Sequence, residues 1–579
     1  MRPIAEIVAS VRSRINSLNE AGELRGRGVD PAWPEAWAAS IPPLLESLDD
    51  ADVHVRRMTT WALGAARPQA ETVVDRLRAR WPAEPDLTVR LGLVLAAGKL
   101  SPYGATWLQG LREHREPQVQ LAATMALGRL AEDIDLVCGA VREGDLAAWR
   151  HNPWYGGTPE SLVWGIDHEL GGHCRARIRF ATRMPAHRDP QVRIGGVKAA
   201  GVVLSTWLSA LPELLPPLVE HLDDPDATVR AFALHLLVAS GEAGPHLDRL
   251  AAMLADETRL SRRGEARIAD IALWGLAWAG DRRARPGLLD QLSTGGVRFP
   301  RSANLFGTSP YMTALPGLHE LLGRLEGWAD VLVPAVRDLL RRADNVELRR
   351  VLAQTLEAWG ASAAPAVPEL RSLLDGDARL WAAAALGAIG PDAESALPAL
   401  RRPPRTATGH LSGVERVTTA WALWRVTGDA EPALAMIGAA LEQGRSNKAL
   451  RLLADFGPLA ARHEEPLRRS LTDIGDWERV EAAHALWRVT GDPTDAVPVL
   501  LQTIQALPEG KVTPVMAAAI GYLGEIGAPA AGAAPLLEAA LAGDLRLNYF
   551  GGWRAFAEDG ERRRHLRRAL DRIQDATAR

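Results

Sequence analysis

One seven-residue sequence occurs twice in this chain. Leu-Trp-Arg-Val-Thr-Gly-Asp spans residues 423–429 and recurs at residues 486–492, each time after an Ala-rich segment with helical spacing. A sequence that recurs at the same place relative to its helix is typical of a repeat architecture. Because a repeat array grows by stacking units rather than by starting new cores, 579 residues need not fold as several globular domains.

Short Ala-rich segments predict the first helix of each repeat. Residues 55–64, 119–128 and 378–387 all place small and apolar side chains at helical spacing and end in Ala-Leu-Gly. A glycine such as Gly360 or Gly428 then suits a left-handed helix end. The next segment opens with proline, as a first helical turn permits, and an acidic turn precedes the following pair. The pattern therefore predicts repeated helix pairs.

This combination of segments resembles HEAT repeats, of the short bacterial kind described as phycobilisome-lyase-like. The resemblance covers nearly the whole chain and implies an all-α solenoid of roughly fifteen helix pairs that form one continuous right-handed superhelix. It is specific for fold and not for function, because the family includes scaffolds, lyases and repair enzymes. The organisation that we predict is N-terminal repeats at 1–143, an aromatic and His-rich insertion at 144–190, central repeats at 191–292, an insertion loop at 293–317, C-terminal repeats at 318–544 and capping helices at 545–579.

Composition narrows the classes of function. The formal net charge is −4, which argues against a dedicated nucleic-acid-binding protein. Two cysteines form no disulfide framework and fit a reducing compartment. The N-terminus lacks an apolar signal core, and no stretch reaches the ~18 apolar residues of a membrane span, so we expect a cytoplasmic protein without membrane contact. Scarce lysine beside abundant arginine suggests a GC-rich bacterial genome.

Tryptophan is over-represented among the aromatic residues, with 19 Trp against 5 Tyr and 7 Phe. The position before the Ala-Leu pair of each repeat is expected to face the concave surface, where large aromatic side chains are typical binding hot spots. The alternative is that these rings fill gaps between helix layers. We expect the binding residues to be Trp61, Trp274, Trp278 and Trp421, with Trp154, Tyr155 and Tyr311 from the two insertions.

The first insertion offers a different chemistry. His168 and His173 nearly reproduce the His-Glu-x-x-His zinc motif, but with one residue too many. They can share a metal only if the two glycines between them break the helix, in which case Cys174 is a further ligand. This leaves an enzyme, or a small-molecule or metal site formed by residues 144–190 over the groove, as the main alternative. A lesser alternative is a HEAT-like DNA-repair glycosylase.

The favoured interpretation is a protein–protein interaction scaffold or adaptor. It binds a protein or peptide on the concave face, uses no metal or other cofactor, and is more readily explained as a non-enzyme.

Overall fold

The computed structural model describes residues 40–577 except 151, 156, 260–266, 295–314, 403–409, 443–446, 473–474, 511 and 550–552. Within these residues every regular element is an α-helix or a 3-10 helix, and an isolated antiparallel bridge joins Arg259 and Arg267. The predicted all-α solenoid of helix pairs is confirmed. The chain divides into two compact units. Unit 1 ends at Ala233 and unit 2 begins at Leu234, so the boundary falls inside α14 (Ala227–Ala239).

Unit 1 is built from helices in two layers. The even-numbered helices pack on one another along one layer, as α6 does on α4 and α8, and as α12 does on α10. The odd-numbered helices form the other layer, in which α11 packs on α9 and α13. The even-numbered helices are α4 (Val53–Leu63), α6 (Leu87–Lys99), α8 (Pro117–Ala126), α10 (Pro159–Leu170) and α12 (Pro190–Thr206). The odd-numbered helices are α3 (Ile41–Glu46), α5 (Ala70–Arg80), α7 (Ala105–Leu111), α9 (Ile134–Glu143), α11 (Cys174–Arg183) and α13 (Leu211–Glu220).

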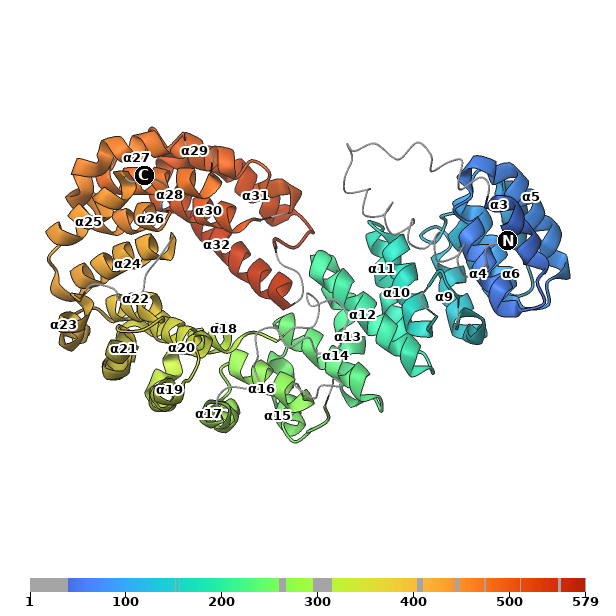
Figure 1. Ribbon diagram of the computed structural model, residues 1–579, viewed down its shortest axis with the longest axis horizontal. Helices are drawn as coiled ribbons and strands as arrows, with labels where there is room; N and C mark the ends of the chain where they lie inside the picture. Colours follow the sequence, from blue (N-terminus) through green and yellow to red (C-terminus); the bar gives the residue numbers. More distant parts are fainter. Residues whose placement is uncertain are drawn as a thin grey trace. The chain divides into compact units, whose positions relative to one another are not determined.

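Unit 2 repeats the same two-layer order. Figure 1 shows α20, α22, α24, α26 and α28 on the inner side of its curve, with α19, α21, α23, α25 and α27 outside them. The inner helices are α16 (Ile268–Trp278), α18 (Leu318–Gly323), α20 (Val346–Trp359), α22 (Arg379–Ile389), α24 (His410–Thr427), α26 (Asn447–Phe456), α28 (Asp476–Thr490), α30 (Pro514–Ile526) and α32 (Trp553–Thr577). The outer helices are α15 (Leu247–Met253), α17 (Arg285–Ser293), α19 (Ala329–Arg342), α21 (Val367–Leu373), α23 (Leu397–Leu400), α25 (Glu431–Glu442), α27 (Glu464–Ser470), α29 (Ala496–Thr503) and α31 (Ala534–Ala542).

Acidic turns both start helices and tie successive repeats together. Asp86 caps α6, where its carboxylate accepts a hydrogen bond from Val89 N at 2.9 Å. The same carboxylate pairs with Arg57 of α4 at 2.9 Å. Further along unit 1, Arg193 of α12 pairs with Asp224 at 2.8 Å. An arginine in the first turns of one inner helix therefore supplies a cation to the turn of the next repeat.

Residues 144–190 contain a regular helix pair. Helices α10 and α11 both pack against α12, so residues 159–183 continue the two-layer order of unit 1. Residues 144–158 do not follow that order and connect α9 with α10. A 3-10 turn at Leu146–Trp149 packs against α6 and α10. The side chain of Trp149 is fully buried, and its indole N–H donates to the Gln118 side chain on α8.

The C-terminal helix of unit 2 contacts the beginning of that unit. Arg554 Nε lies 3.2 Å from Glu320 Oε1, across 234 positions of sequence, and Arg324 pairs with Glu561, 237 positions away. In Figure 1 the first turns of α32 accordingly lie toward α18. Arg563 of the same helix bonds Asp559 at 2.9 Å and donates to the carbonyls at the end of α31 and just after it. Among the helices described, none combines the length and apolar character needed to cross a bilayer.

Candidate functional site

The inner layer of unit 2 carries a row of aromatic and titratable side chains on four consecutive helices. Two of its hydrogen bonds connect neighbouring inner helices, from α24 to α26 and from α28 to α30. We call this row the inner polar strip. It consists of Trp421 on α24, Lys448, Arg451 and Asp455 on α26, Glu481 and His484 on α28, and Tyr522 and Glu525 on α30.

Trp421 stands at one end of the inner polar strip. Its indole Nε1 donates to Asp455 Oδ2 at 2.9 Å, and the guanidinium of Arg425 lies 6.0 Å from its ring. The ring rests on α22 at Gly387, where a Cβ would lie 2.8 Å from Trp421 Cε3. The glycine of the Ala-Leu-Gly motif is therefore required for this close approach. Trp421 is half-buried, so part of its ring remains accessible.

The opposite end of the strip is a network of four side chains on α28 and α30. The hydroxyl of Tyr522 donates to Glu481 Oε2 at 2.9 Å. The imidazole of His484 stacks on the Tyr522 ring with a centroid separation of 3.6 Å, and its Nε2 lies 3.2 Å from Glu525 Oε2. Glu481 is 3% exposed. A carboxylate this deeply buried is stable only with hydrogen-bond partners, and Tyr522 supplies one.

Charged groups in the middle of the strip perturb one another. Burial raises the pKa of Glu481, against the hydrogen bond from Tyr522 and the nearby cation of Arg451, which lower it. Burial likewise raises the pKa of Glu357 on α20, with Lys448 and Arg451 acting in the opposite direction. Burial, and then the charge of Arg451, lowers the pKa of Lys448. Lys448 thus lies within electrostatic reach of acids on both α20 and α28.

This arrangement suits recognition of polar groups. Because burial disfavours their charged forms, the carboxyls of Glu481 and Glu357 and the amine of Lys448 reach their neutral forms more readily than exposed groups do, and a neutral carboxyl can both donate and accept a hydrogen bond. Groups perturbed in this way by burial and by specific neighbours are concentrated at functional sites. Across the part of the chain that the structure describes, no three His, Cys, Asp or Glu side chains gather in a metal-binding arrangement.

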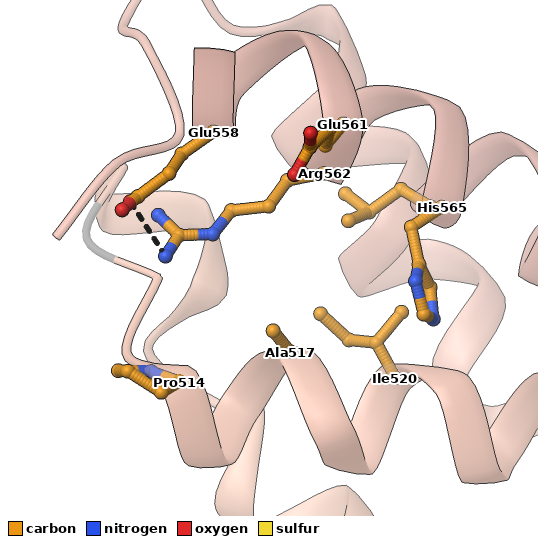
Figure 2. Close-up of a pocket in the computed structure, with 8 residues that line it drawn as sticks. Pro514, Ala517, Ile520, Glu558, Glu561, Arg562 and His565 are labelled. Atoms are coloured by element: carbon orange, nitrogen blue, oxygen red, sulfur yellow. Dashed lines mark ion pairs between the residues drawn. The ribbon is translucent and has the colours of Figure 1, made fainter. Parts of the chain in front are cut away.

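A crevice lies beside the strip, between α30 and α32 (Figure 2). Its volume is about 360 Å³, within the range of small-molecule sites. Pro514, Ala517 and Ile520 form an apolar floor on the side of α30, and Figure 2 shows the polar side chains reaching in from α32 on the other side. The residues contributed by α32 are Glu558, Glu561, Arg562, His565 and Leu566.

The tryptophans predicted in unit 1 pack against helices. Trp61 on α4 is half-buried against the core of this unit. Trp154 is also half-buried, and its ring covers Gly64 at the end of α4, where a Cβ would lie 2.7 Å from Trp154 Cζ2. Tyr155 covers Gly165 of α10 and donates from its hydroxyl to Glu169 at 2.8 Å. Part of each ring stays accessible, so their binding roles stay predictions.

Trp274 and Trp278 belong to one aromatic group on α16. Trp274 is 1% exposed and lies between the His235 ring at 5.4 Å and the Trp278 ring at 5.7 Å. Its expected place on the concave surface is therefore not what the structure shows, because the neighbouring aromatic rings enclose it. Trp278 is half-buried, and the Arg324 guanidinium lies 4.1 Å above its ring. Trp278 is thus the accessible member of the pair.

The remaining predicted residues are dispersed. Tyr311 lies outside the described residues. Gly171, with a φ of +51°, ends α10, so the two glycines do break the helix, as a shared metal would need. The exposed His168 belongs to the last turn of α10, and the exposed His173 precedes α11, which Cys174 begins. The structure assembles no ligand set from these three residues.

Several residues of the site were missed from the sequence. Glu481, Lys448 and Tyr522 look like ordinary surface positions of amphipathic helices. One signal was available, because His484 occupies the position before the Ala-Leu pair that Trp421 occupies in its own repeat. Nothing in the sequence pairs α30 with α32 or Glu357 with Lys448.

No protein-family model matches this sequence, and no curated protein matches it. Solved structures with a related arrangement of helices include the Kap95:Nup1 complex, with a TM-score of 0.44, 12% identity and coverage of 100% of this chain and 88% of that chain. Yeast importin-beta (Kap95p) gives a TM-score of 0.39 and 12% identity, covering 94% of this chain and 85% of that one. Kap121p bound to Pho4p gives a TM-score of 0.35 and 11% identity, covering 97% of this chain and 78% of that chain. The likeness concerns helical-repeat architecture alone.

Proposed function

We propose that this protein is an interaction scaffold or adaptor that binds a protein or peptide along the inner layer of unit 2. The inner polar strip carries the proposal. It presents a half-buried aromatic ring and perturbed charged groups on four consecutive inner helices. Such a surface combines an anchor for apolar groups with donors and acceptors for a polar backbone.

The shape of the strip favours an extended ligand. Its polar groups follow the helices from Trp421 to Glu525 and do not converge on one point, as groups that act on a single reacting bond do. An extended peptide advances about 3.3 Å per residue and packed helices lie about 8–10 Å apart, so about every third side chain would lie over the next inner helix. The ring of Trp421 would hold an apolar side chain, and Lys448 and the exposed Arg451 would bond the carbonyls of the peptide backbone.

The finer assignments rest on the sequence. We propose that the chain belongs to the short bacterial HEAT-repeat kind and acts in the cytoplasm, as its cysteine content and its Val-Arg and Ala-Leu-Gly motifs support. Trp61, Trp154, Tyr155 and Trp278 are proposed as secondary contacts.

Site-specific photo-crosslinking in native lysate tests the proposal. A photoreactive residue at Arg451, exposed on α26, is compared with one at Arg371, exposed on the outer helix α21. We expect discrete protein adducts from position 451 alone, and their loss when Trp421→Ala is added. Trp164→Ala is the matched control, because Trp164 is exposed on α10 and lies outside the strip. Equal adducts from both positions, or adducts indifferent to Trp421→Ala, contradict the proposal.

A further inference from the structure

The crevice between α30 and α32 is lined by two acidic side chains and one guanidinium. The acids are Glu558 and Glu561, and the guanidinium is that of Arg562. Arg562 bonds Glu558 at 2.8 Å and the carbonyl of Leu547 at 3.1 Å, so its charge is already used inside the protein. Burial, and then the charges of Arg568 and Arg572, lowers the pKa of His565, so this imidazole adds little positive charge at neutral pH. Glu561 is the most exposed acid of the crevice, with half of its side chain accessible.

The structure already holds a guanidinium at Glu561. Arg324 reaches it from the segment that follows α18, and the pair is exposed to solvent on both sides, at 38% and 50% of the respective side chains. The guanidinium of Arg324 also covers Trp278 at 4.1 Å. An exposed ion pair of this kind contributes little to stability, so a competing cation can displace it. The carboxylate of Glu561 thus already binds a guanidinium, and another guanidinium can take the place of Arg324.

The floor of the crevice specifies the rest of the ligand. Pro514, Ala517 and Ile520 present carbon atoms opposite the carboxylates. An arginine or lysine side chain has the matching two parts, because its methylene stem packs on apolar surface while its charged end reaches an acid. Arginine fits better than lysine, since its planar fork pairs with a carboxylate through two hydrogen bonds.

We infer that the crevice between α30 and α32 is a specificity pocket for a basic side chain, preferably arginine, of the bound peptide. The inference rests on the proposed function for the source of the side chain. The guanidinium enters between Glu558 and Glu561, displaces Arg324 from Glu561, and the stem lies on the apolar floor. Displacement of Arg324 also uncovers the ring of Trp278, so occupancy of the pocket enlarges the accessible aromatic surface of unit 2.

Calorimetric titration of the full chain with two probes tests the inference. The probes are agmatine, which is an arginine side chain without its backbone, and an acetylated peptide amide with one central arginine. Their neutral counterparts carry a urea group in place of the guanidinium. We expect both cationic probes to bind and both neutral probes to bind at least tenfold more weakly. Equal binding of cationic and neutral probes overturns the inference.

Four variants assign the binding to the crevice. Glu561→Gln should weaken binding of agmatine about tenfold, and Ala517→Leu should weaken it by filling the floor. Arg324→Ala should tighten it about threefold, because the internal competitor is gone. Glu538→Gln, at an exposed acid of α31 outside the crevice, is the control and should leave it unchanged. Unchanged affinity in Glu561→Gln, with thermal unfolding showing an intact fold, overturns the inference.

The two probes separate this inference from the proposed function. Binding of the peptide and of agmatine supports a pocket for a peptide side chain, whereas agmatine binding without the peptide overturns the peptide source. If both probes bind but position 451 crosslinks nothing, the proposed scaffold role fails and the pocket stands. If crosslinks form at position 451 but no cation binds, the pocket fails and the scaffold role stands.

Discussion

Two regions of this molecule place a tryptophan ring on a glycine of the same repeat motif, and they use it differently. In unit 1, Trp154 covers Gly64, and the adjoining Trp149 is fully buried with its N–H bonded to a side chain. In unit 2, Trp421 covers Gly387 and leads into a row of charged groups that includes Glu481, which is almost fully buried. Tryptophan therefore does not by itself separate packing from binding in a repeat array. Buried acids occur in both units, but Asp167 of unit 1 pairs with the guanidinium of Arg177, whereas Glu481 accepts a hydrogen bond from the neutral hydroxyl of Tyr522. A buried acid bonded to a neutral partner is the better indicator of a site.

Trp149→Ala should produce the largest change in the comparison. Removing a fully buried indole leaves a cavity between α8 and α10 and an unpaired Gln118 side chain. We expect the free energy of unfolding of unit 1 to fall by about 3–5 kcal/mol, measured by chemical denaturation. A loss below about 1 kcal/mol would show that residues 144–158 do not support the core of unit 1.

Replacing Gly387 and Gly64 with alanine tests whether the rings of Trp421 and Trp154 need a glycine beneath them. A Cβ at Gly387 would lie 2.8 Å from Trp421 Cε3 and 3.0 Å from Ala422 Cα, and a Cβ at Gly64 would lie 2.7 Å from Trp154 Cζ2. We expect each variant to lose about 1–3 kcal/mol of unfolding free energy. Gly387→Ala should lose more, because it also meets backbone, and should shift the tryptophan emission spectrum. Gly413→Ala is the control, since a Cβ there has no atom within 4 Å.

Glu481→Gln tests whether the strip retains a charge at the expense of stability. The folded protein raises the pKa of Glu481, so the native state keeps this proton to higher pH than the unfolded chain does. Stability of the wild type is therefore lost as pH rises from the usual range of glutamate through the raised pKa. We expect the variant to be more stable by about 1 kcal/mol at pH 8 and equal to the wild type near pH 4.

The measurement is urea denaturation at several pH values, with Glu538→Gln as the matched exposed acid. A stability difference that does not change with pH would mean that Glu481 has no raised pKa in the folded protein. Weakened crosslinking at position 451 in a more stable variant would tie the buried charge to binding.

Trp164→Ala should give the smallest effect. Its side chain is 39% exposed, so much of its area is already hydrated in the folded protein. We expect a change of about 0.5 kcal/mol or less in the free energy of unfolding, measured alongside Trp149→Ala. A larger loss would show that exposed tryptophans of unit 1 also stabilise the fold through packing.

The local pattern predicted most helix ends. Two of the three Ala-Leu-Gly segments end helices, α4 and α8, whereas α22 continues past Gly387 to Ile389. Gly360, Gly428 and Gly491 take the positive φ of a helix end. The acidic turns cap the next helices, as at Asp86. These features depend on backbone geometry and on neighbours within one turn, which the sequence states directly. The site was predicted less well, since Trp421 was identified but Glu481, Lys448 and Tyr522 were not.

Sequence alone determined the repeat, the helix pairs, their caps and the acidic turns, because each depends on contacts within a turn or between adjacent segments. Only the tertiary structure decided that Trp274 is enclosed while Trp421 is accessible, although both occupy the same aligned position of the repeat. It alone brought Glu357 within reach of Lys448, and Arg324 against Glu561. Burial and long-range pairing follow from how the inner helices curve and stack, and side-chain periodicity within one repeat carries no information about that curvature.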